Sequence, residues 1–199
     1  MPVTSNPQSR PLPHASHRAS IIGMWLFLAA LAMLFIASIL GYILIRLHLA
    51  GTSEPQHLGL PWGTWVSTAV LLAGSYTIHR AVYNVRLERL NQLNAWLRVT
   101  LVLAIAFLVI QFPCLVRILA DHRKAHAMNN NLYGLIFCLI VLHALHVVGG
   151  VVFLSLVTYK ASRQVYDHEN YLGVRHAAVY WHFLDVVWIV MFAMFTLTA

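Results

Sequence analysis

The chain has 199 residues, of which 60% are hydrophobic and only 10% are charged, and its formal net charge is +7. A soluble domain carries about 25% charged residues, so this composition indicates an integral membrane protein and excludes an ordinary soluble enzyme. The basic residues lie between apolar runs rather than in a stripe, which is typical of the charges that flank membrane spans and argues against nucleic-acid binding.

The chain begins with a polar segment, residues 1–20, that is rich in proline and serine and contains no acidic residue. Such a composition predicts a disordered tail, followed by one membrane domain over residues 21–199. Five apolar runs in that domain are long enough to cross a bilayer, which takes about 20 residues each. They cover residues 21–45, 64–83, 95–119, 132–159 and 177–197. The sequence therefore predicts an all-α bundle of five transmembrane helices.

The distribution of lysine and arginine predicts how this bundle is oriented. Nine of the 13 basic residues fall in the tail, in or next to the connection between the second and third runs, or between the fourth and fifth runs. The other four lie between the first and second runs, or in or next to the connection between the third and fourth. Because basic residues concentrate on the cytoplasmic side, we expect the N-terminus in the cytoplasm and the C-terminus outside.

The last run, which contains VYWHFLDVVWIVMF over residues 179–192, carries two ionisable residues near its centre. His182 and Asp185 are three positions apart, so they share one face of a helix and can interact. A charged group at the middle of a span costs about 2.5–3.5 kcal/mol on insertion scales, and such groups therefore have partners or roles. The sequence thus predicts a polar site within the membrane.

The fourth run contains a matching pattern, HALHVVGG. His143, His146 and Gly150 lie on one stripe, and Gly149 and Gly150 are small enough to let a second helix approach closely. Consecutive runs are expected to be antiparallel neighbours. We therefore expect His143 or His146, together with His182, to surround Asp185 and donate hydrogen bonds to its carboxylate, so that Asp185→Leu impairs assembly.

Three interpretations of these histidines remain open from the residues alone. They can be interhelical hydrogen-bonding groups, axial ligands of a b-type haem, or parts of a proton or ion relay, as in a small transporter. Trp181 and Trp188 flank the polar stripe and would fill the space that a haem needs. The two tryptophans are expected to pack where the fourth and fifth runs meet, or against another subunit or lipid.

The two polar patterns resemble motifs of subunit III of the haem–copper respiratory oxidases, the cytochrome c and quinol oxidases. Typical members carry an aromatic-Trp-His-Phe-[Val/Leu]-Asp-Val-Val-Trp segment in the last helix and a His-x-x-His-Val segment in the helix before it. Both segments occur here, at residues 180–188 and 143–147. The Gly-Met-x-x-Phe opening at residues 23–27 and the Leu-Leu-Ala stretch at residues 71–73 also match.

The resemblance implies a non-catalytic subunit in the bacterial cytoplasmic membrane, since the five-span form is found in many bacteria. It implies that this chain has no catalytic, haem, copper or other metal site of its own. Haem and copper are expected on partner subunits, with subunit I as the direct partner and subunit II in the same complex, and bound phospholipid is expected. Cytochrome c oxidase is the first expectation, and a quinol oxidase or a nitric oxide reductase complex is the alternative.

The chain departs from the family at three positions where many members carry glutamate. Leu31, Cys114 and Arg175 occupy these positions. In the family these glutamates are thought to support proton uptake, so the departures put that property in doubt for this chain.

Overall fold

The computed structural model describes residues 13–49, 62–87, 89–126, 131–163 and 172–198. These residues form five helices and no strand, which confirms the all-α prediction. The helices are α1 (Pro13–Leu49), α2 (Gly63–Arg86), α3 (Leu90–His126), α4 (Asn131–Ser162) and α5 (Leu172–Thr198).

Every helix extends beyond both ends of the apolar run that predicts it. Hydropathy marks only the lipid-facing part of a helix, whereas polar residues in the flanking turns continue the same backbone hydrogen bonding. The difference is largest at the start, because α1 begins at Pro13, within the segment expected to be a disordered tail. Proline is favoured in a first helical turn because it lacks the N–H that would have no partner there. The rest of that expected tail, residues 1–12, lies outside the described residues.

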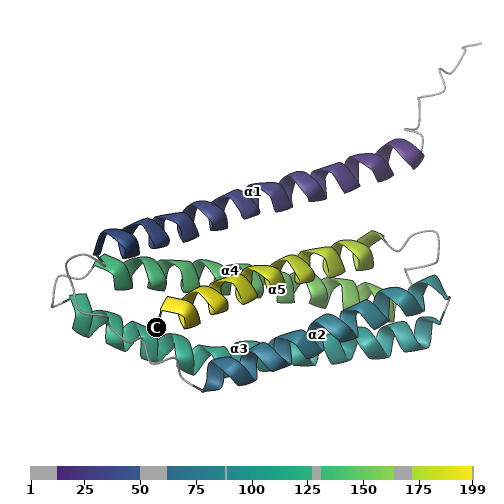
Figure 1. Ribbon diagram of the computed structural model, residues 1–199. Coiled ribbons are helices and arrows are strands. Elements are labelled where there is room, and N and C mark those ends of the chain that lie inside the picture. Colours follow the sequence, from purple (N-terminus) through teal and green to yellow (C-terminus); the bar gives the residue numbers. More distant parts are fainter. Residues whose placement is uncertain (1–12, 50–61, 88, 127–130, 164–171, 199) are drawn as a thin grey trace, which may run out of the picture.

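The helices α2, α3, α4 and α5 form a closed four-helix bundle. Within this ring α2 packs against α3, α3 against α4, α4 against α5, and α5 against α2. Among the described residues, α1 contacts only α4 and α5, so it lies outside this ring on the far side from α2 and α3 (Figure 1). One apolar core fills the bundle. A second, which includes Phe35, Tyr42 and Met191, lies between α1 and the α4–α5 pair.

Four helices contain a segment that is long and apolar enough to cross a membrane. These segments are Arg18–Ile45, Leu90–Cys114, Cys138–Ser162 and Leu172–Leu197. Over the described residues, α2 is less apolar than this. Helices long and apolar enough to span a membrane are thus confirmed for α1, α3, α4 and α5, and a span by α2 stays a prediction.

Several hydroxyl side chains of α2 bond to neighbouring helices. Ser67 donates to Gln111 Oε1 at 3.0 Å, and Thr77 Oγ1 accepts from Thr100 Oγ1 at 2.9 Å, both across the contact with α3. Interhelical hydrogen bonds of this kind satisfy polar groups without water. These hydroxyl groups of α2 are thus satisfied within the chain.

Candidate functional site

The polar pair of the last helix forms as the spacing predicts. His182 Nδ1 lies 3.6 Å from Asp185 Oδ2, one helical turn away on α5. The Asp185 side chain is 6% exposed and that of His182 is 41% exposed. Neither carboxylate oxygen of Asp185 has a hydrogen-bond partner among the described residues. The acid is thus buried, and the imidazole beside it reaches the surface of the chain.

The partner helix of this pair is α2 rather than α4. Ser75 Oγ lies 2.8 Å from His182 Nδ1, in a hydrogen bond whose direction depends on the imidazole tautomer. Two turns further along α5, Trp188 Nε1 donates to Thr68 Oγ1 at 3.0 Å. Thr68 and Ser75 are seven positions apart, so they lie on one face of α2. Two polar contacts at the same seam therefore connect α5 to α2.

The two histidines of α4 do not join this group. The Nδ1–H of His146 donates to the Leu142 carbonyl of its own helix at 2.7 Å. Its ring meets Phe35 of α1 edge-on, with 5.4 Å between the ring centroids. The His143 ring stacks on Trp188 at 5.4 Å, and neither of its nitrogens has a hydrogen-bond partner among the described residues. The expected donation from α4 to Asp185 is not formed, because the acid lies beside His182 on the side of α5 that meets α2.

The glycine pair of α4 divides into one packed and one open position. A Cβ atom on Gly150 would lie 3.0 Å from Tyr180 Cε1 and 3.1 Å from Leu184 Cδ1. On Gly149 the nearest atom would be Tyr180 Oη at 3.9 Å. Tyr180 also donates to the His146 carbonyl at 3.0 Å. At this level α4 and α5 are in contact, which leaves no room for a haem between them.

The order of these contacts makes the last two helices antiparallel, as expected. Gly150 lies at Tyr180, and His143 lies at Trp188. Trp181 and Trp188 are both buried within the chain. Trp181 packs toward Gly74, whose Cβ would be 3.6 Å from its Nε1. Trp188 therefore packs where α5 meets α4, whereas Trp181 packs against α2.

Sequence reasoning missed the residues that these side chains contact. Ser75 and Thr68 are the polar partners on α2, and Phe35 and Tyr180 are the aromatic contacts of α4. The i, i+7 spacing of the two hydroxyls was an available signal that they share a face. Nothing in the sequence pairs that face with α5.

The positions that depart from the family pattern have ordinary structural roles. Leu31 belongs to the apolar core. Cys114 is buried, with its thiol directed to the Ile110 carbonyl at 3.7 Å. Arg175 is exposed. Leu31 and Cys114 thus replace an ionisable group by an apolar or weakly polar one inside the protein.

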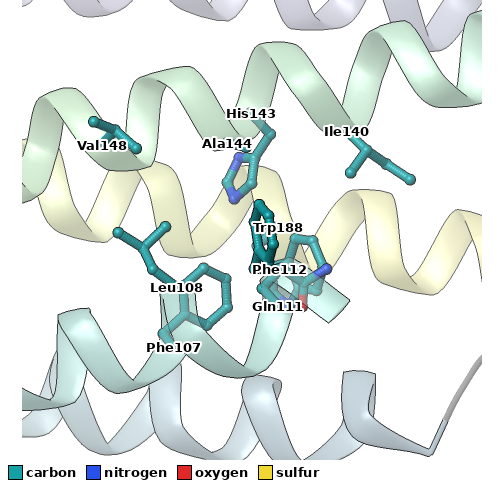
Figure 2. Close-up of a pocket in the computed structure, with 9 residues that line it drawn as sticks. All are labelled: Phe107, Leu108, Gln111, Phe112, Ile140, His143, Ala144, Val148 and Trp188. Atoms are coloured by element: carbon teal, nitrogen blue, oxygen red, sulfur yellow. The ribbon is translucent and has the colours of Figure 1, made fainter. Parts of the chain in front are cut away.

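A pocket of about 280 Å³ lies between α3 and α4, with Trp188 of α5 on its inner side (Figure 2). His143 and Gln111 are its polar lining residues, and the remaining lining residues are apolar or aromatic. No group of three or more His, Cys, Asp or Glu side chains is placed to hold a metal ion in the part of the chain that the structure describes.

Comparison of the sequence with known proteins assigns this chain to a family. The family model described as cytochrome c oxidase subunit III matches residues 14–198. The chain belongs to the cytochrome c oxidase subunit III family. The match includes all five helices except the first residue of α1, so family membership rests on the whole membrane domain.

Individual relatives of this subunit III chain carry names of both oxidase classes. The chain is 27% identical over 175 residues to a quinol oxidase subunit 3 of Bacillus subtilis, covering 88% of this chain and 85% of the relative. It is 28% identical over 184 residues to a cytochrome bo(3) ubiquinol oxidase subunit 3 of Pseudomonas aeruginosa, with 90% and 85% covered. It is 29% identical over 190 residues to a cytochrome c oxidase subunit 3 of Synechocystis, with 90% and 76% covered.

Proposed function

We propose that this chain is the accessory subunit III of a respiratory haem–copper oxidase in a bacterial cytoplasmic membrane. The observation that carries the proposal is the family match over nearly the whole chain. In this role the chain performs no chemistry itself. It packs directly against subunit I, which holds haem and copper, in a complex that includes subunit II. Because matched relatives include both cytochrome c and quinol oxidases, the proposal is made for the oxidase class and not for one donor.

The same proposal assigns five spans to the chain. With 24 residues, α2 is about 36 Å long at 1.5 Å per residue, against a hydrocarbon core of about 30 Å. Its hydroxyl groups at Ser67, Ser75 and Thr77 are bonded to α3 or α5. These contacts support a span by α2, and the distribution of basic residues supports a cytoplasmic N-terminus.

Fusions to alkaline phosphatase, which is active only outside the cytoplasm, test this topology. A fusion after Gly51 is expected to be active and a fusion after Leu87 inactive, because α2 returns the chain to the cytoplasm. A green fluorescent protein fused at the same two positions should give the reverse pattern. Activity of alkaline phosphatase at both positions would show that α2 does not cross the membrane.

The described residues support a packing role for this chain in the proposed complex. The contact of α5 with α2 closes the four-helix bundle. Aromatic contacts attach α1 to it, because Phe35 meets His146 of α4 and Phe27 meets Tyr180 of α5. Large apolar side chains such as Trp25, Met33 and Phe112 remain exposed on the chain. Exposed apolar surface of this kind suits contact with subunit I and with phospholipid. The proposed work of the chain is to stabilise subunit I and the lipid around it.

The proposal is tested by purifying the tagged chain from its native membrane in a mild detergent. A reduced-minus-oxidised spectrum is recorded on the intact preparation and on the chain after it is separated from its partners. We expect haem absorbance in the intact preparation and none on the separated chain. Stoichiometric haem on the separated chain would make it a cytochrome, and purification as a colourless single chain would also contradict the proposal.

A further inference from the structure

The pocket between α3 and α4 is lined by residues from three helices of this chain. Phe107 and Phe112 of α3 line one side, Ala144 and Val148 of α4 line the other, and Trp188 of α5 closes the inner end (Figure 2). Its volume is about 280 Å³. A dry apolar cavity of about 150 Å³ accommodates benzene, so this pocket has room for one or two fused rings.

The outer rim of the pocket lies on the exposed apolar surface of the chain. Phe112 is 66% exposed and Val148 is 48% exposed. Both belong to segments that are long and apolar enough to cross a membrane, Leu90–Cys114 and Cys138–Ser162. A molecule dissolved in the lipid phase can therefore enter sideways between α3 and α4 without passing through water.

The inner part of the pocket is bordered by a side chain whose hydrogen bonding the chain leaves unused and whose two ring nitrogens are themselves buried. His143 is 2% exposed, and neither ring nitrogen has a hydrogen-bond partner among the described residues. A neutral imidazole has one N–H donor and one acceptor nitrogen, and burial without partners costs free energy. Figure 2 shows the ring projecting from α4 toward Trp188. Gln111 accepts from Ser67 at 3.0 Å through Oε1, so its amide nitrogen is the end left to donate.

The lining also favours a flat ligand. The His143 ring stacks on Trp188, with 28° between the ring planes. Phe107 meets the same indole edge-on at 5.6 Å. Aromatic rings prefer such stacked and edge-on neighbours. A lipid acyl chain would fill the apolar volume and leave both nitrogens of His143 unpaired.

We propose that this pocket binds a membrane-dissolved molecule with a flat ring that carries a carbonyl or hydroxyl oxygen. The His143 imidazole donates to a carbonyl or accepts from a hydroxyl, and Trp188 and Phe107 contact the ring. Binding involves no covalent or redox step. The site goes beyond the packing role of the chain as a subunit, because it assigns a ligand to residues of this chain.

The test is photolabelling of the purified full chain, with any partners it retains, by an azido-1,4-naphthoquinone, followed by mass spectrometry of the labelled peptides. We expect saturable labelling of α3 and α4 around Phe112 and Val148. Excess 1,4-naphthoquinone or 2-naphthol should displace the probe, and the stronger competitor shows whether a carbonyl or a hydroxyl is preferred.

Variants connect the labelling to the pocket. Ala144→Phe fills the volume and should reduce labelling at least tenfold. Leu145→Phe, a neighbouring exposed position on the same helix, is the matched control and should change labelling less than twofold. His143→Leu keeps the apolar lining and should weaken binding about fivefold, the factor that one hydrogen bond represents. Equal yield and elution of the variants establish that the fold is retained.

Three results would overturn the proposal. The first is labelling that avoids α3 and α4, and the second is equal labelling of the Ala144→Phe variant. The third is labelling of the same residues by a diazirine fatty acid that naphthoquinone does not displace, which would identify an acyl chain as the occupant. The haem spectrum is recorded on the same preparation, so a failure of the proposed function is seen separately.

Discussion

Replacing Gly150 with leucine is expected to separate α4 from α5 and to lower the apparent Tm of the detergent-solubilised chain by about 6–12 °C. The Cβ atom alone would lie 3.0 Å from Tyr180 Cε1 and 3.1 Å from Leu184 Cδ1, closer than ordinary van der Waals contact. Over-packing of this kind costs up to about 3 kcal/mol, and each kcal/mol shifts Tm by about 2–4 °C in a chain of this size. The measurement is the fraction of chain that elutes as a single species after heating.

Gly149→Leu is the matched control, since it makes the same chemical change one residue away. Gly149 is exposed, and its Cβ would have only Tyr180 Oη nearby, at 3.9 Å. We expect its apparent Tm to lie within about 2 °C of the original chain. An equal loss of stability in both variants would show that added bulk acts on membrane insertion or helix formation, and not on the contact between α4 and α5.

The contact at Gly150 also shows what the sequence predicts well. A small residue on a polar stripe indicates close helix approach, and a short connection between consecutive apolar runs favours antiparallel packing. Both expectations concern residues that are near in the chain, so helical periodicity and connection length are sufficient to make them. The existence of five helices follows from the same kind of local pattern.

The polar contacts of α5 show what the sequence does not determine. Ser75 and His182 are separated by 107 positions, and periodicity gives the face of a helix without naming the helix that covers it. The histidines of α4 looked like partners of Asp185 because they are near in sequence and similar in pattern. In the bundle α5 lies between α2 and α4, and the His182–Asp185 pair meets α2 while His143 stacks on Trp188.

The pocket between α3 and α4 was also beyond sequence reasoning. Its volume depends on how Phe107, Phe112 and Trp188 are oriented once the helices have packed, and no pattern of apolar residues encodes a void. His143 was singled out for its polarity, but its lack of a hydrogen-bond partner is visible only when all its neighbours are placed.

The arrangement around Asp185 reverses the expected ranking of substitutions. Sequence reasoning made Asp185→Leu the damaging change, because it would leave several histidines without an acceptor. In the structure only His182 is within ion-pair distance of Asp185 among the described residues, and His182 keeps its hydrogen bond to Ser75 when the acid is removed. Asp185→Leu should therefore cost no more than about 1 kcal/mol, the upper value for an ion pair with a solvent-exposed partner.

His182→Leu is expected to be the more severe change, lowering the free energy of unfolding by about 2 kcal/mol. It leaves a buried carboxylate without its neighbouring imidazole. Removal of one partner of a fully buried pair costs about 3–5 kcal/mol, and the 41% exposure of His182 lowers that cost. The double variant His182→Leu/Asp185→Leu should recover most of the loss, because apolar replacement of both partners is close to neutral. Thermal stability of the four forms in the same detergent gives the interaction energy, expected to be about 2 kcal/mol.

The same four variants separate a structural pair from a proton relay. If the pair is structural, His182→Leu lowers the yield of the intact complex, and the double variant restores both yield and function. If the pair moves protons, Asp185→Leu and the double variant assemble normally but pump fewer protons per oxygen consumed. A partly exposed His182 beside a buried acid fits both roles. The result that decides between them is whether the double variant recovers both the yield and the function of the complex.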